Sequence, residues 1–289
     1  MNYGFFRVAA ASLKLKVANP SYNKEEIKKA IDKAVSEDVR LLVTPELSIT
    51  GYTCADLFFT KALQEAADEA LKDLAVYTQG KNIAVVVGLP VAFYNSLYNC
   101  AVVLMNGGIL GIVPKTHMAN YNEFYEKRWF ASGKQFEACQ GINIYGFETK
   151  IGNQIFDLGG GAVLGIEICE DLWVPNPPSS KLVQHGANII VNLSASDEYV
   201  SKAEYRRDLI ANQSARCICG YVYAGASVYE STTDLVFSGA TLISENGSIL
   251  AAGERFSRDN VVTIADIDIE KLNSLRLNNM SFENSSDGI

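Results

Sequence analysis

Short apolar runs alternate with longer amphipathic stretches along most of this chain of 289 residues. In the stretch 21–35, Ile27, Ile31 and Val35 recur at a spacing of four residues. Side chains spaced in this way lie on one face of an α-helix, so the stretch is predicted to form a helix with a buried apolar face. The run 40–44 is short and mostly apolar, which is typical of a buried β-strand.

The same pattern predicts further elements along the chain. Helices are expected at 61–78, 178–185 and 202–219, and strands at 5–11, 82–89, 98–105, 109–114, 162–168, 188–192, 221–225, 240–243 and 248–252. The turn sequences at 106–108 and 245–247 each contain Asn-Gly and predict antiparallel hairpins. Alternation of strands and helices favours parallel pairing. Together these signals predict an α/β fold with mixed sheets and helices on their outer faces.

The organisation into domains follows from the linkers and the end of the chain. No Pro-, Gly- or Ser-rich stretch divides the chain, and its length fits either one domain or two. From Arg276 onward the periodicity is lost and polar residues dominate. We therefore expect one domain over 1–275 and a polar tail or linker over 276–289.

The charge balance narrows the classes of partner. The chain has 25 Lys and Arg residues against 33 Asp and Glu residues, which gives a net charge of −8. Nucleic acids and anionic membranes select basic surfaces, so neither is expected as a partner. The first residues, Met1 to Gly4, carry no basic charge, and no run of about eighteen apolar residues follows, so neither a signal peptide nor a membrane span is expected.

The cysteines and histidines bear on metals and on the compartment. Six cysteines are scattered along a chain long enough to bury its own core, which indicates reduced thiols in a cytoplasmic protein. The chain has only two histidines, and Cys217 and Cys219 form the only close cysteine pair. Metal sites usually draw on several such ligands at short spacings, so no metal site is expected.

Cys169 is the candidate nucleophile. It directly follows the predicted strand 162–168 and precedes two carboxylates, Glu170 and Asp171. A side chain at a corner between a strand and a turn projects from the end of the sheet, and the backbone N–H groups that follow point toward whatever it attacks. The alternative is a buried apolar thiol, which is our interpretation of the cysteines at 54, 100, 139, 217 and 219.

A cysteine nucleophile needs a base. His117, in a polar loop, and His185, at the end of a predicted helix, are weak candidates. Glu46 lies at the carboxyl end of the strand 40–44, where a desolvated carboxylate can act as a base. Lys115 closes the strand 109–114, where a buried ammonium can stabilise an oxyanion. The alternatives are an exposed loop glutamate and a surface lysine.

Several stretches together carry a resemblance to a known family. They are 43–52 (VTPELSITGY), 115–130 (KTHMANYNEFYEKRWF), 165–173 (GIEICEDLW), 192–196 (NLSAS), 213–216 (QSAR) and 230–234 (ESTTD). They resemble the nitrilase superfamily of carbon-nitrogen hydrolases and, within it, the glutaminase domains of glutamine-dependent NAD synthetases. The resemblance extends over about residues 5–275. It implies a four-layer α-β-β-α sandwich of the nitrilase type.

The resemblance also implies roles for the candidate residues. Glu46 would take the proton of Cys169, whose thiolate would attack the side-chain amide of L-glutamine and form a glutamyl thioester. Lys115 and the backbone N–H of Glu170 would hold the oxyanion. Glu126 matches the second glutamate of the family, which positions the lysine.

The residues implied to bind glutamine are Tyr121, Glu170, Ser196 and Lys202. Arginine also occurs in the family at the position of Lys202, and the two cations do not grip a carboxylate in the same way. Tyr121 and Tyr125 could equally be structural residues, because a tyrosine on an amphipathic stretch is usually a core aromatic.

Full-length members of this branch continue into a synthetase domain that binds ATP. This chain has no phosphate-binding loop, since its one glycine run, 159–161, is typical of a turn. We expect a glutaminase domain that needs no cofactor itself, with ATP and magnesium needed only by a synthetase domain in cis. The family also implies a homo-oligomer. The alternatives are a stand-alone amidase or carbamoylase and a non-catalytic interaction domain.

Overall fold

The computed structural model describes residues 4–136, 138–144 and 146–283 and contains two mixed β-sheets. The eight-stranded sheet has the order β14 (Val261–Asp268), β1 (Phe5–Ser12), β2 (Leu41–Val43), β3 (Ala84–Phe93), β4 (Ser96–Met105), β5 (Gly108–Pro114), β7 (Phe147–Ile151) and β6 (Gln140–Ile144). The six-stranded sheet has the order β13 (Ser248–Ala252), β12 (Thr241–Glu245), β11 (Gly220–Gly225), β10 (Ile189–Ser194), β9 (Val163–Ile168) and β8 (Phe156–Asp157).

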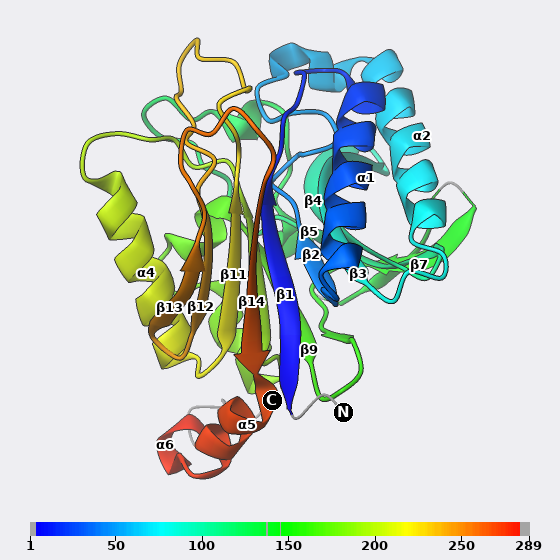
Figure 1. The fold of residues 1–289 in the computed structure, drawn as a ribbon. Coiled ribbons are helices and arrows are strands. Elements are labelled where there is room, and N and C mark those ends of the chain that lie inside the picture. The colour runs from blue at the N-terminus through cyan, green and yellow to red at the C-terminus, as the bar shows by residue number, and fades with distance from the viewer. Residues whose placement is uncertain (1–3, 137, 145, 284–289) are drawn as a thin grey trace.

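Helices cover the outer face of each sheet. The α-helices are α1 (Pro20–Ser36), α2 (Lys61–Tyr77), α3 (Pro178–Gln184), α4 (Lys202–Arg216), α5 (Ile269–Leu277) and α6 (Met280–Glu283), and the short 3₁₀ helices are η1 (Ala55–Phe59), η2 (Glu126–Arg128), η3 (Gly133–Gln135) and η4 (Cys169–Leu172). Figure 1 shows α1 and α2 on one side of the strands and α4 on the other. The predicted α/β class with mixed sheets and outer helices is thereby confirmed.

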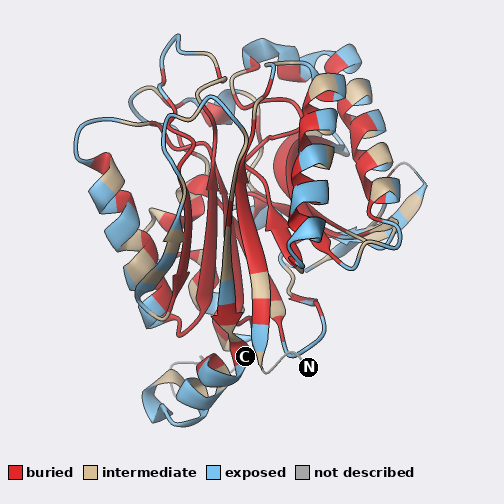
Figure 2. Ribbon diagram, in the orientation of Figure 1, coloured by how far each residue is buried: buried red, intermediate tan, exposed pale blue. Residues whose placement is uncertain are grey.

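Three apolar layers hold the sandwich together. In β1, Val8 and Ala10 pack into the cluster between the two sheets, while Ala9 and Ala11 pack into the cluster beneath α1 and α2. Successive side chains of a strand point to opposite faces, so a strand buried on both faces is apolar at nearly every position. A third cluster lies between the six-stranded sheet and the helices α3 and α4. Figure 2 shows the resulting buried strands between helices whose outer faces are exposed.

The start of α1 agrees with its sequence, and one predicted core position does not. The Asn19 side chain accepts a hydrogen bond from the backbone N–H of Tyr22 (3.1 Å), and Pro20 begins the helix, as expected for a capped N-terminus. Val35, which we expected on the buried face, is 37% exposed. Ala34 is fully buried in its place, because the face that packs on the sheet rotates slightly along the helix.

The first and last strands of the described residues are neighbours in the eight-stranded sheet. β1 pairs antiparallel with β14, from Phe5 opposite Asp268 to Ser12 opposite Val261. The guanidinium of Arg7 also donates to both carboxylate oxygens of Asp266, at 2.8 and 2.9 Å. Four strands, β6, β7, β8 and β14, and the helices α5 and α6 were missing from the sequence prediction. β6 and β7 form an edge hairpin in which exposed polar residues weaken the apolar alternation.

The predicted tail begins in contact with the domain. Arg276, at the end of α5, donates hydrogen bonds to the backbone carbonyls of Ala187 (2.8 Å), Cys217 (3.0 Å) and Ile218 (3.0 Å). Residues 284–289 of the predicted tail lie outside the described residues. The boundary at residue 275 stays a prediction. In the part of the chain that the structure describes, none of the helices combines the length and the apolar character that a bilayer crossing requires.

Gly88 lets the segment after β2 pass close to β3. A Cβ atom at this position would lie 2.3 Å from the backbone nitrogen of Leu47 and 2.9 Å from the carbonyl oxygen of Pro45. The carbonyl of Gly88 also accepts a hydrogen bond from the N–H of Ile49 (3.0 Å). Glu46 therefore sits in a segment that is packed tightly against the backbone of the neighbouring strand.

We predict that Gly88→Ala lowers the free energy of unfolding by about 1–3 kcal/mol, because the added methyl group overpacks a backbone contact. Urea denaturation monitored by circular dichroism measures the change. Gly141→Ala is the matched control, since a Cβ atom at that strand position meets nothing within 4 Å. Equal unfolding midpoints for the two variants would contradict the prediction.

Candidate active site

Four chain segments meet at one end of the sandwich. β2, β3 and β5 run in the same direction, so the residues that follow β2 and β5 lie at the same end of the eight-stranded sheet. Glu46 comes from the first of these segments and Lys115 from the second. In the facing sheet, Cys169 follows β9 and Ala195 follows the adjacent parallel strand β10. The carboxyl ends of parallel strands thus gather side chains that are far apart in sequence.

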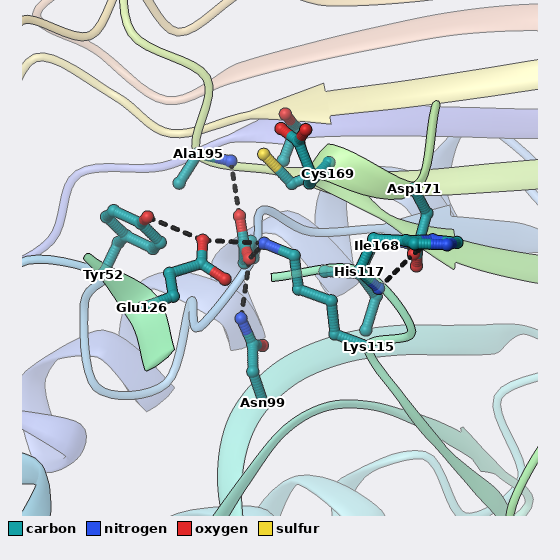
Figure 3. A network of polar contacts seen from close by, with 12 residues as sticks. Tyr52, Asn99, Lys115, His117, Glu126, Ile168, Cys169, Asp171 and Ala195 are labelled. Atoms are coloured by element: carbon teal, nitrogen blue, oxygen red, sulfur yellow. Dashed lines mark hydrogen bonds and ion pairs between the residues drawn. The ribbon is translucent and has the colours of Figure 1, made fainter. Parts of the chain in front are cut away.

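Glu46 connects the two sheets. Only 1% of the residue is exposed. Its Oε1 accepts hydrogen bonds from Lys115 Nζ (2.7 Å) and from Asn99 Nδ2 (2.6 Å). Its Oε2 accepts a hydrogen bond from the backbone N–H of Ala195 (2.9 Å), which belongs to the other sheet (Figure 3). Each carboxylate oxygen is therefore held in a fixed direction.

The ammonium of Lys115 lies between two carboxylates. Lys115 is fully buried, and its Nζ lies 2.7 Å from Oε1 of Glu46 and 2.7 Å from Oε1 of Glu126. The hydroxyl of Tyr52 donates to the same oxygen of Glu126 (2.8 Å). Burial lowers the pKa of Lys115, but the two carboxylates outweigh burial, and the net effect is a raised pKa. Lys115 is thus held as a cation.

Two carboxylates share this one cation. Burial, followed by repulsion from Glu46, raises the pKa of Glu126 to about 7, and Lys115 opposes the rise. The protons of such close groups belong to the cluster rather than to one residue. The cluster can therefore accept and release a proton near neutral pH, which is what general acid-base chemistry requires.

Cys169 lies above this cluster. Figure 3 shows its sulfur on the side of the Lys115 ammonium and of Ala195. The residue is 4% exposed and has a left-handed backbone φ of 45°. Burial, followed by the charge of Glu46, raises the pKa of the thiol, while Lys115 and the hydroxyl of Ser194 act in the opposite direction. The resting thiol is therefore neutral and needs a base before it can attack.

Two of the four residues implied to bind glutamine, Tyr121 and Glu170, contact each other beside the cysteine corner. The hydroxyl of Tyr121 donates to Oε2 of Glu170 (2.8 Å). Half of Tyr121 is exposed, so its interpretation as a core aromatic is wrong. Burial and the hydrogen bond to Glu170 raise the pKa of Tyr121, and the charges of Cys169 and Asp197 add to the rise.

The other two lie after β10. Ser196 is largely buried and directly follows Ala195, whose N–H binds Glu46. Lys202 begins α4 and pairs with Asp197. Its ammonium also lies over the rings of Tyr199 (4.9 Å) and Trp173 (5.3 Å). Lys202 is thus partly neutralised by a carboxylate of the chain itself.

Neither histidine pairs with Cys169. The Nδ1 of His117 contacts Oδ1 of Asp171 (2.9 Å), and the Nδ1 of His185 contacts the carbonyl of Lys181 (2.8 Å). Sequence reasoning missed Tyr52 and Asn99 as partners of the carboxylates. Tyr52 ends the motif 43–52, so the family resemblance could have indicated it. Asn99 lies inside an apolar strand, where no sequence pattern indicated a role.

The described residues hold no group of three or more His, Cys, Asp or Glu side chains gathered as metal ligands. The glycines at 159–161 form a turn between β8 and β9, with positive φ angles at all three. One pocket among the described residues has a volume of about 950 Å³. Its lining includes both histidines and the lysines Lys134 and Lys181.

The architecture is that of the nitrilase fold. An amidase from Nesterenkonia sp. AN1 superposes with a TM-score of 0.74 and 18% identity, over 96% of this chain and 98% of that chain. The four-layer sandwich of the nitrilase type is therefore confirmed. Residues 7–277 match the carbon-nitrogen hydrolase family model, and the chain belongs to this family.

Two of the similar proteins are named glutamine-dependent NAD(+) synthetases. A curated relative from Mycobacterium tuberculosis (strain ATCC 25618 / H37Rv), a glutamine-dependent NAD(+) synthetase, is 38% identical over 98% of this chain and 42% of its own length. A solved glutamine-dependent NAD(+) synthetase from Cytophaga hutchinsonii has a TM-score of 0.82 and 30% identity, over 91% of this chain and 43% of that chain. The predicted resemblance is confirmed, and the chain spans less than half the length of these relatives.

We predict that Glu126→Gln changes the pH dependence of stability. Because the pKa of Glu126 is raised from 4.5 to about 7 in the folded state, its stabilising contribution is complete below 4.5 and is lost as the pH rises through 7. The variant lacks this titration, so its unfolding free energy relative to the wild type should increase from pH 4.5 to 7. Urea denaturation at several pH values in this range measures the difference.

Asp56→Asn is the control for this experiment. Hydrogen bonds from Arg128 and Trp129 lower the pKa of Asp56 below its ordinary value of 3.8. Its contribution is therefore complete above 3.8 and is lost only at lower pH. The difference between this variant and the wild type should stay constant over the range in which Glu126→Gln changes. A constant difference for both variants would contradict the assignment.

Proposed function

We propose that this chain is a glutamine amidohydrolase that releases ammonia through a glutamyl thioester on Cys169. The observation that carries the proposal is the buried cluster of Glu46, Lys115 and Glu126 beside a neutral, buried thiol. This arrangement supplies a base, a cation for an oxyanion and a nucleophile, which hydrolysis of an amide needs. The choice of glutamine is supported by similarity to relatives named glutamine-dependent NAD(+) synthetases.

The first step forms the carbon–sulfur bond. Glu46 takes the proton of the Cys169 thiol, and the sulfur attacks the carbon of the side-chain amide. The electron pair of the carbonyl moves to its oxygen, which then carries a negative charge. The ammonium of Lys115 and the backbone N–H of Glu170 stabilise this oxyanion. Glu126 and Glu46 keep Lys115 protonated and in place for that role.

The next steps release the products. As the oxyanion collapses, the carbon–nitrogen bond breaks, and protonated Glu46 gives its proton to the leaving nitrogen, which departs as ammonia. Glu46 then takes a proton from a water molecule that attacks the thioester. The carbon–sulfur bond breaks, the thiol is restored and glutamate leaves. The hydrogen bonds from Asn99 and Ala195 aim the Glu46 carboxylate throughout.

The α-carboxylate and the α-ammonium of glutamine need partners of opposite charge in the site. Lys202 offers a cation for its carboxylate, and Glu170 offers a carboxylate for its ammonium, with Tyr121 and Ser196 as further hydrogen-bonding groups. Because Lys202 also pairs with Asp197, the carboxylate of the substrate competes with Asp197 for this cation. The amide end of the substrate is thereby directed toward Cys169.

In this proposal the glutaminase supplies ammonia to a second domain of a longer protein. The similar relatives are more than twice as long as this chain, which supports a synthetase domain in cis. The domain over 1–275 and the linker over 276–289 are part of the same proposal. The synthetase domain would use ATP and magnesium to consume the ammonia in NAD synthesis. All six cysteines are free thiols, which supports a cytoplasmic setting. We also propose a homo-oligomer, as in the family.

We predict that Cys169→Ala lowers ammonia release from glutamine about a thousandfold or more, because no other group can form the thioester. A coupled glutamate dehydrogenase assay measures ammonia. Cys139→Ser, at a cysteine that is partly exposed, is the matched control and should keep the wild-type rate. Unchanged release by Cys169→Ala would favour a non-catalytic domain.

A second prediction concerns covalent labelling. An electrophilic glutamine analogue, such as a diazo ketone, should add its mass to the peptide that carries Cys169, since the thiolate attacks the electrophilic carbon. Peptide mass spectrometry locates the adduct, and excess glutamine should protect the site. A panel of small amides is assayed alongside. Turnover of other amides without turnover of glutamine would favour the stand-alone amidase and overturn the proposed substrate.

A further inference from the structure

We infer that Asp171 is a positioning residue that joins the Lys115 segment to the Cys169 corner, with His117 as its partner. The inference rests on the proposed role of Cys169 and Lys115, and it does not depend on which amide is hydrolysed. Asp171 lies in η4, two residues after Cys169, and is 2% exposed. It touches neither the substrate nor the reacting atoms in the proposed reaction.

One carboxylate receives four donors from the two segments. Oδ1 of Asp171 accepts hydrogen bonds from the backbone N–H of His117 (2.8 Å) and contacts Nδ1 of the same residue (2.9 Å). Oδ2 accepts from the backbone N–H groups of Ile168 (3.0 Å) and Thr116 (3.4 Å). Figure 3 shows His117 and Asp171 together, beside Ile168 and on the far side of Lys115 from Glu126.

The donors to Asp171 come from segments next to Lys115 and next to Cys169. Thr116 and His117 directly follow Lys115, whereas Ile168 directly precedes Cys169. Lys115 extends from the eight-stranded sheet and Cys169 from the six-stranded sheet. Asp171 therefore fixes the peptide units next to the cation and next to the nucleophile with the same two oxygens. A buried carboxylate is stable only with such donors, so the two segments are held in one arrangement.

The backbone of Cys169 needs this support. A non-glycine residue in the left-handed region costs free energy, and the surrounding structure must hold it there. Asn192 holds the corner from the neighbouring strand, since its Oδ1 accepts from the N–H of Cys169 (3.2 Å) and its Nδ2 donates to the Cys169 carbonyl (3.4 Å). Asn192 acts within the six-stranded sheet, whereas Asp171 reaches across to the other sheet. Asp171 therefore joins the segment that carries the ammonium to the corner that carries the sulfur, in addition to the bridge that Glu46 makes between Lys115 and Ala195.

Asp171→Asn tests the inference. The amide keeps the shape but has one acceptor oxygen, and its NH₂ group faces N–H donors, so the two segments should separate. We expect kcat for ammonia release to fall about tenfold to hundredfold, because small misplacements of reacting groups are costly. KM should change by less than about threefold, because the groups proposed to bind the substrate head are elsewhere. A purely structural role predicts lower thermal stability with an unchanged kcat per folded molecule, and that result would overturn the inference.

His117→Asn tests the partner without removing the buried carboxylate. The His117 side chain is 23% exposed, so the variant should fold, and it keeps the backbone hydrogen bond to Asp171. We expect a smaller loss of kcat than for Asp171→Asn. If the two residues act as one unit, the double variant should lose no more activity than Asp171→Asn alone. Additive losses would overturn the inference, as would a wild-type kcat for His117→Asn.

Alkylation of Cys169 by iodoacetamide separates this inference from the proposed substrate. The reaction needs no glutamine, and mass spectrometry follows it on the peptide that carries Cys169. Lys115 favours the thiolate, so the alkylation rate should fall in Asp171→Asn and in His117→Asn. Asp266→Asn, which breaks the surface pair with Arg7, should alkylate at the wild-type rate. Wild-type rates in the two site variants would overturn the inference even if the substrate proved to be another amide.

Discussion

The Glu46 carboxylate is the contact on which the rest of the site depends. A charge this deeply buried is stable only if cations and N–H groups surround it. Its three donors come from β4, from the end of β5 and from the end of β10, so neutralising one charge draws both sheets together. Gly88 lets the segment that carries Glu46 pass close to β3, which places the carboxylate between these donors. The same contacts therefore hold the two sheets together and position the Glu46 carboxylate.

The electrostatics of the cluster follow from burial and from an unequal number of charges. Two buried carboxylates face one ammonium, and burial, followed by the negative charge of Glu46, raises the pKa of Glu126 and of the Cys169 thiol. Proton transfer between such neighbours needs little rearrangement, because each group already has a fixed direction. The proposed proton transfer therefore relies on carboxylates rather than on a histidine.

The sequence predicted the parts of the structure that local pattern controls. The strands before Glu46 and Cys169 are buried apolar runs, and a strand end is a local feature that can be read directly. The role of Glu126 came only from the family resemblance, because its spacing from Lys115 has no regular period. Contacts between distant residues, such as Asn99 with Glu46, could not be predicted, since they depend on how strands are ordered in the sheet. The edge hairpin β6–β7 was missed because its exposed positions carry polar residues.

The pairing of the first strand with the last has a consequence for synthesis on the ribosome. Arg7 and Asp266 lie 259 positions apart and still form a pair across β1 and β14. At elongation rates of roughly 5–20 residues per second, β1 waits roughly 10–50 s before its partner strand is made. During that interval one edge of the eight-stranded sheet is unpaired and open to association with other nascent chains. The N-terminal half of this sandwich is therefore most exposed to aggregation in the interval before β14 is made.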